Sequence, residues 1–171
     1  MYAVSGNGNA EGTGAMTPDE LMRRAIALAQ ETMDANRGGP FGAVIARDGE
    51  IVAEGTNEVT SSNDPTAHAE VSAIRAACEK LGTYDLSGCE IYSSCEPCPM
   101  CLAAVYWAHL DRLWFGNTRI DAADIGFDDE FLYRELAEPV HARRIPTQQL
   151  LGDEAGHAFA AWKIKPDKVP Y

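Results

Sequence analysis

The chain has 171 residues, of which 46% are apolar and 23% charged, and this composition predicts one soluble globular domain with a good-sized core. Its 14 basic and 26 acidic side chains give a net charge of −12 at pH 7, which disfavours a nucleic-acid partner. No apolar run approaches the roughly 20 residues that span a bilayer, and no basic-then-apolar signal opens the chain. We therefore expect a cytoplasmic protein without a membrane partner.

A leader, a helix and a hairpin are predicted first. Residues 1–15 are rich in Gly, Asn, Ser and Ala without an apolar period, which predicts a disordered leader. Thr17-Pro18-Asp19-Glu20 has the pattern of a capping box, and the apolar spacing after it predicts a helix that ends before Gly38-Gly39-Pro40. Asp48-Gly49 lies between the apolar stretches Phe41–Ala46 and Ile51–Ala53, which predicts a β-hairpin.

Helices and strands alternate through the rest of the chain. The apolar spacing predicts two helices and two strands after the hairpin: helices over Ala69–Leu81 and Pro99–His109, strands over Cys89–Ser93 and Arg112–Phe115. Weaker patterns follow: a helix over Asp129–Leu136, a strand over Ile145–Leu150 and a helix over Ala155–Trp162. Alternation with short connections predicts a layered α/β domain over residues 16–162. Residues 163–171 form a tail with two prolines and no period.

Two short motifs hold three residues that can bind a metal ion. His68 stands in Thr-Ala-His-Ala-Glu, and Cys98 and Cys101 stand in Pro-Cys-Pro-Met-Cys. One imidazole and two thiolates favour zinc, and three protein ligands leave the fourth tetrahedral position open for water, as in catalytic sites. Both motifs open predicted helices, where the helix dipole favours thiolates and a spacing of three puts both sulfurs on one face. We therefore predict one catalytic Zn²⁺ per subunit.

Glu70, two residues after His68, is the predicted proton carrier. Two thiolates cancel the charge of Zn²⁺, so the bound water is less acidic than at an all-histidine site. A neighbouring base is then useful, and Glu70 is available.

The cysteines leave one alternative open. An odd count of five without a secretion signal argues against a disulfide framework. Cys95 precedes Cys98 by three residues and could supply a fourth ligand that closes the site. The chain would then be a structural-zinc interaction module, in which the loss of Glu70 would have no chemical effect.

The order His-x-Glu…Pro-Cys-x-x-Cys is the signature of zinc nucleobase deaminases, and the sequence resembles the cytidine-deaminase-like superfamily. The resemblance implies a three-layer α/β/α sandwich with a central mixed sheet. It also implies hydrolytic deamination with zinc hydroxide as the nucleophile and Glu70 as the proton shuttle. From about residue 17 onward the chain is most similar to short bacterial guanine deaminases, which carry similar motifs: residues 38–44, 62–71, 94–101 and 122–129.

This resemblance implies a purine substrate, with guanine converted to xanthine and ammonia, and a homodimer whose swapped tail closes the partner's active site. Asp129 would contact the base and share proton transfer, although it could instead be a helix cap. The resemblance further implies five substrate-binding residues: Phe41, Asn57, Ala69, Trp107 and Tyr171. Without it, the two ring residues Phe41 and Trp107 would be ordinary core residues, and Asn57 would satisfy turn backbone groups.

Two other deaminase activities remain as alternatives. A guanosine deaminase would carry the same motifs, which do not reveal whether the pocket admits a ribose. A tRNA adenosine deaminase also shares the zinc motif, but the net charge of −12 disfavours its polyanionic substrate.

Overall fold

The computed structural model describes residues 14–170. Most of the predicted leader and Tyr171 therefore lie outside the described residues. The backbone contacts divide the chain into two units, Met1–Asp129 and Glu130–Tyr171. The first unit contains the sheet and both metal-binding motifs.

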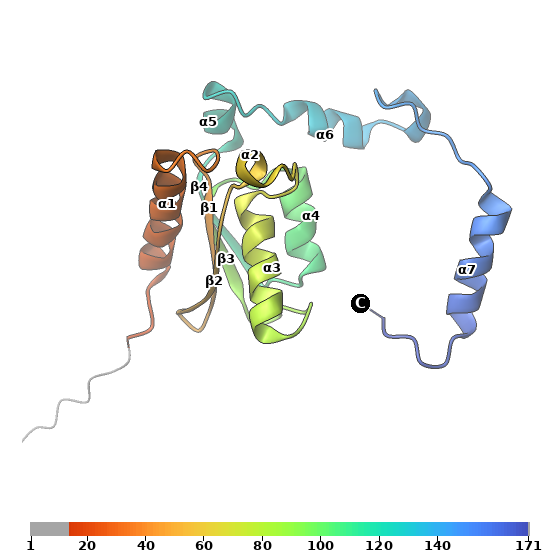
Figure 1. Ribbon diagram of the computed structural model, residues 1–171, viewed down its shortest axis with the longest axis horizontal. Helices are drawn as coiled ribbons and strands as arrows, with labels where there is room; N and C mark the ends of the chain where they lie inside the picture. The colour runs from red at the N-terminus through yellow and green to blue at the C-terminus, as the bar shows by residue number, and fades with distance from the viewer. Residues whose placement is uncertain (1–13, 171) are drawn as a thin grey trace, which may run out of the picture. The chain divides into compact units, whose positions relative to one another are not determined.

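The first unit is built on a four-stranded mixed sheet with the strand order β2-β1-β3-β4. Strand β1 (Gly42–Arg47) pairs antiparallel with β2 (Glu50–Thr56) and with β3 (Glu90–Cys95), and β3 pairs parallel with β4 (Arg112–Asn117). Helix α1 (Pro18–Asp34) covers one face of the sheet, and α3 (Ala69–Leu81) and α4 (Pro99–Trp107) cover the other (Figure 1). The predicted three-layer α/β/α sandwich with a central mixed sheet is confirmed.

Helix α1 begins with the predicted capping box. The Thr17 hydroxyl accepts a hydrogen bond from the Glu20 backbone N–H at 3.3 Å, and the Glu20 carboxylate accepts one from the Thr17 N–H at 2.8 Å. These bonds satisfy backbone donors that a helix start leaves without partners. The apolar face of α1 then packs on Val44 and Tyr92, whose side chains share one side of the sheet.

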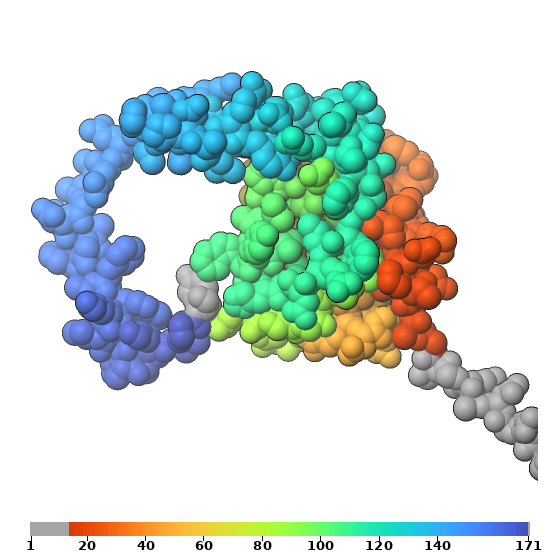
Figure 2. Space-filling model, turned by 180° about the vertical axis from the view of Figure 1, so that it is seen from behind, coloured from red at the N-terminus to blue at the C-terminus, as the bar shows by residue number. Residues whose placement is uncertain are grey.

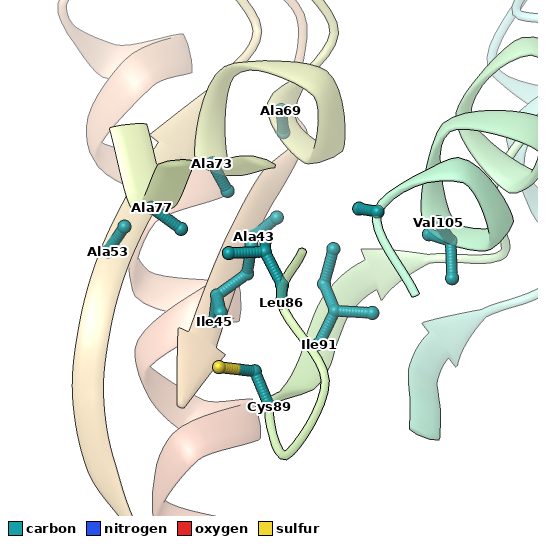
Figure 3. Packing of buried hydrophobic residues seen from close by; sticks show 11 residues of the cluster. Ala43, Ile45, Ala53, Ala69, Ala73, Ala77, Leu86, Cys89, Ile91 and Val105 are labelled. Carbon is teal, nitrogen blue, oxygen red and sulfur yellow. The ribbon is translucent and has the colours of Figure 1, made fainter. Parts of the chain in front are cut away.

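Helix α3 lies very close to the sheet because it presents alanine there. Ala69, Ala73 and Ala77 are fully buried against Ile45 and other core residues (Figure 3). A Cβ atom at Gly55 of β2 would come within 2.2 Å of the Ala69 carbonyl oxygen, so glycine is required at this contact. This close packing fixes the start of α3, which carries His68 and Glu70.

The edge strand β4 leads into α5 (Arg119–Asp124), which begins with a second capping box at Thr118. Both elements lie at the surface of the first unit, teal in Figure 2, and they expose Phe115 and Ile120. A one-turn helix, α2 (Val59–Ser62), follows β2 and precedes the turn that leads to His68.

The second unit is helical. It contains α6 (Glu130–Ala137), a 3₁₀ turn over Val140–Ala142 and α7 (Gly152–Ile164). The predicted elements up to residue 137 are present, most of them within one or two residues of their expected ends, and the second strand of the hairpin continues three residues beyond Ala53, to Thr56. The predicted strand over Ile145–Leu150 is wrong, because residues 145–150 form no regular element. The described part of this unit contains no strand that could pair with them. Among the described residues, no helix is long and apolar enough to cross a membrane.

Candidate active site

Two helix starts bring the predicted metal ligands together beyond the end of β3. His68 is the N-cap of α3, Cys98 is the N-cap of α4, and Cys101 lies in the first turn of α4. The His68 Nδ1 atom lies 3.7 Å from the Cys98 Sγ atom and 3.5 Å from the Cys101 Sγ atom, and the two sulfurs are 3.6 Å apart.

These separations fit one tetrahedral zinc ion. Zn–S and Zn–N bonds of about 2.3 and 2.0 Å place neighbouring ligand atoms about 3.5–3.8 Å apart. Among the described residues, His68, Cys98 and Cys101 are the group of three or more potential ligands that could hold a metal ion. The predicted zinc site is therefore confirmed, and a fourth position remains for water.

The two thiols differ in how readily they release a proton. The hydrogen bond between the Cys98 and Cys101 side chains lowers the pKa of Cys98 to about 4 and raises the pKa of Cys101. The hydrogen bond with Cys98 also raises the pKa of His68. One thiolate is thus stable before a metal binds, and coordination of zinc deprotonates the second.

Cys95 is not part of this group of ligands. Its thiol points to the Thr118 carbonyl oxygen at 3.7 Å, and burial raises its pKa to about 11. The Cys95 sulfur therefore bonds to a carbonyl oxygen outside the group formed by His68, Cys98 and Cys101. The open three-ligand site is therefore favoured over a closed structural site.

Glu70 lies in the first turn of α3 with only 6% of its surface exposed. Its carboxylate accepts a hydrogen bond from the Ser93 hydroxyl at 3.1 Å, and burial raises its pKa. A carboxyl group with a raised pKa holds a proton more readily than an exposed one, which suits a group that accepts and returns protons. No sequence motif points to Ser93, because β3 also carries the polar residues Glu90 and Ser94.

Asn57 is buried against the loop that carries the three residues Gly38, Gly39 and Pro40. Its Oδ1 atom accepts hydrogen bonds from the backbone N–H groups of Gly39 at 3.3 Å and Val59 at 3.4 Å. A Cβ atom at Gly38 would lie 1.9 Å from the Asn57 carbonyl oxygen, so the close approach of the loop to Asn57 requires glycine at position 38. The side-chain oxygen of Asn57 thus has a structural role, and its amide nitrogen has no such bond to these groups.

Phe41 follows the same loop and is partly buried. Its ring packs edge-on against Phe127, with the ring centres 4.9 Å apart and an interplanar angle of 89°. Phe127 precedes Asp129 by two residues, so this pair ties the end of the first unit to the loop. Burial and the negative charge of Cys98 raise the pKa of Asp129.

The remaining predicted substrate contacts lie in different surroundings. Ala69 is fully buried at the start of α3. Trp107, the last residue of α4, is 66% exposed, so the alternative that it is a core residue of the first unit is wrong. Tyr171 lies outside the described residues.

Comparisons with known proteins agree with this site. A family model for the cytidine and deoxycytidylate deaminase zinc-binding region matches residues 16–117. A guanine deaminase from Bacillus subtilis is 51% identical over 156 residues, which are 91% of this chain and 100% of that protein. An X-ray structure of guanine deaminase from B. subtilis superimposes with a TM-score of 0.89, covering 91% of this chain and 99% of the other. A tRNA-specific adenosine deaminase from Agrobacterium fabrum is 47% identical over 77 residues, which are 45% of this chain and 51% of that protein.

Proposed function

Because the chain belongs to the family of the cytidine and deoxycytidylate deaminase zinc-binding region, we propose that it is a zinc-dependent hydrolase that converts guanine and water to xanthine and ammonia. The observation that carries this proposal is 51% identity to a guanine deaminase over the whole length of that protein. The metal-binding group and the buried Glu70 beside it provide the chemistry that this reaction needs.

Zinc, Glu70 and Ser93 have different roles in the proposed hydrolysis. When bound, zinc supplies an acidic site that activates water for attack on a ring carbon. The Glu70 carboxylate takes the water proton, delivers it to the adjacent ring nitrogen and then assists the departure of ammonia. Ser93 donates to one carboxylate oxygen and thereby fixes the direction of the other. The burial of Glu70 limits competing proton exchange with solvent.

We further propose that the purine is held by residues around this centre. The Asn57 amide nitrogen would donate to an acceptor on the base, because its oxygen already accepts two backbone N–H groups. The Phe41 ring would pack against the base, and Asp129, whose pKa is raised, would exchange a second proton. Ala69 and the exposed Trp107 are proposed as further contacts.

Two alternative substrates, tRNA and guanosine, have less support than guanine. The tRNA adenosine deaminase relative shares only 51% of its own length with this chain, and a net charge of −12 opposes binding of RNA. Guanosine is the stronger alternative to guanine as the substrate, because the metal centre acts on the ring and does not contact a ribose.

A panel of substrates tests the assignment. We expect guanine to be turned over at an ordinary enzymatic rate, of the order of 1–10³ per second, and guanosine, adenosine and cytosine to be turned over far more slowly. The measurement is ammonia release, with each product identified by mass. Turnover of guanosine or cytosine with no reaction of guanine would refute the assignment while leaving zinc chemistry in place.

We also propose a homodimer in which residues 163–171 close the partner's active site. The second unit exposes large apolar side chains whose hydration is unfavourable: Leu150, Leu151, Phe159, Trp162 and Ile164. A partner subunit would cover such a surface. The cytoplasmic location and a role in purine catabolism stay predictions.

Deleting Pro170 and Tyr171 tests the role of the tail. We expect guanine turnover to fall by about tenfold or more, because an uncovered site admits water and loses a contact. The unfolding temperature should change little, because chain ends seldom contribute to packing. Turnover and thermal unfolding are measured on the same samples. If both fall together, the tail is structural.

A further inference from the structure

The turn that presents His68 is organised by Asp64. Residues Asp64-Pro65-Thr66-Ala67 form a β-turn in which the Ala67 N–H donates to the Asp64 carbonyl oxygen at 3.1 Å. Proline is favoured at the second position of such turns and aspartate at the first. The Asp64 Oδ1 atom accepts from the Thr66 backbone N–H at 2.8 Å and from the Thr66 hydroxyl at 2.7 Å. The His68 N–H then donates to the Thr66 carbonyl oxygen at 2.8 Å, so this turn sets the position of the ligand's backbone.

Arg75 ties the same turn to the helix that follows His68. From α3 its Nη1 atom reaches the second carboxylate oxygen of Asp64 at 3.3 Å, and its Nη2 atom donates to the Thr66 hydroxyl at 3.2 Å. The Thr66 hydroxyl therefore donates to Asp64 and accepts from Arg75. Asp64, Thr66 and Arg75 form a closed network that fixes the turn relative to the start of α3.

We propose that Asp64 is a positioning residue for the metal centre, which holds His68 within ligand distance of both sulfurs through its bonds to Thr66. Zinc dissociates through steps in which a ligand moves away from the ion, and a rigid turn makes this movement of His68 rarer. Mutation of residues that orient metal ligands through hydrogen bonds typically lowers metal affinity by about 10- to 100-fold. The inference concerns zinc retention and does not depend on which base is deaminated.

The interactions of Asp64 with Arg75 and with Thr66 should contribute unequally to the retention of zinc. The ion pair with Arg75 is partly exposed, with 59% and 38% of the side chains accessible, so its strength is small and falls with salt. The bonds to Thr66 are short and charge-assisted, and they act directly on the turn. Asp64→Asn keeps an acceptor oxygen for Thr66 and loses the charge, whereas Asp64→Ala loses both.

Zinc release from the loaded protein into a chromogenic chelator tests the proposal. Asp64→Ala should release zinc at least about tenfold faster than the unmodified protein, and Asp64→Asn should stay within a few-fold of it. Glu54→Ala is the matched control, since it breaks the ion pair in which Arg24 joins α1 to β2 at 2.7 and 2.9 Å. This control should lower the unfolding temperature and leave zinc release nearly unchanged.

Three results would each overturn the proposal: an unchanged release rate in Asp64→Ala, equal acceleration in Asp64→Asn, or equal acceleration in Glu54→Ala. If Asp64→Ala does not fold, Thr66→Val is measured in its place. Its control is Thr60→Val, because the Thr60 hydroxyl makes only a long hydrogen bond, at 3.4 Å, to the Arg37 carbonyl oxygen. Faster release in Thr66→Val alone supports the proposal, and equal release contradicts it. No purine is present in these measurements, so failure of guanine turnover would not affect them.

Discussion

Replacing Glu70 with glutamine should leave zinc bound and lower the turnover of guanine by about 10²- to 10⁴-fold. Glutamine has the same volume and can still accept the hydrogen bond from the Ser93 hydroxyl. It cannot carry a proton from water to the ring and on to ammonia. The measurement is kcat on guanine together with the zinc content of the purified variant.

A control for this variant lies on the same helix. Glu79→Gln makes the same chemical change on the exposed side of α3 and should leave turnover within a factor of about two. The turnover of Ser93→Ala should lie between those of these two variants, because this change keeps the Glu70 carboxylate and removes only the hydrogen bond that orients it. Near-normal turnover of Glu70→Gln would contradict the mechanism and would favour the structural-zinc alternative.

Replacing Cys101 with alanine should remove zinc and reduce guanine turnover to background. The Cys101 thiol is fully buried, 3.6 Å from the Cys98 sulfur and 3.5 Å from the His68 Nδ1 atom, so no other side chain can take its place without moving the helix start. Two remaining ligands hold zinc too weakly for it to survive purification. Zinc per chain and turnover are measured before and after addition of excess zinc.

Cys95→Ala distinguishes the open site from a closed one. Cys95 is also buried and lies three residues before Cys98, but its thiol points to the Thr118 carbonyl oxygen. We expect this variant to keep one zinc ion and most of its turnover. Loss of zinc from Cys95→Ala would show that four protein ligands surround the metal, and the open position for water would be refuted.

The metal-binding group was predictable because its determinants are local. The order of His68, Glu70, Cys98 and Cys101 places all four at the starts of two helices, and helix geometry then aims the two sulfurs at one point. The sheet also followed from local signals, such as the turn at Asp48-Gly49.

Contacts between distant segments could not be predicted in the same way. Ser93 meets Glu70 only because β3 is central in the sheet and α3 packs across it. Phe127 meets Phe41 because the chain returns from α5 to the loop before β1. Residues 145–150 were predicted to form a strand, but a strand needs a partner edge, and the described part of the second unit has none.

Zinc-dependent deamination of guanine is tested by a zinc titration of the metal-free protein, with xanthine and ammonia measured as the products of guanine. We expect equal amounts of both products and a rate that rises linearly until one zinc ion is bound per chain, with no further rise. Guanine left unreacted at full zinc loading, or full turnover without zinc, would contradict this expectation.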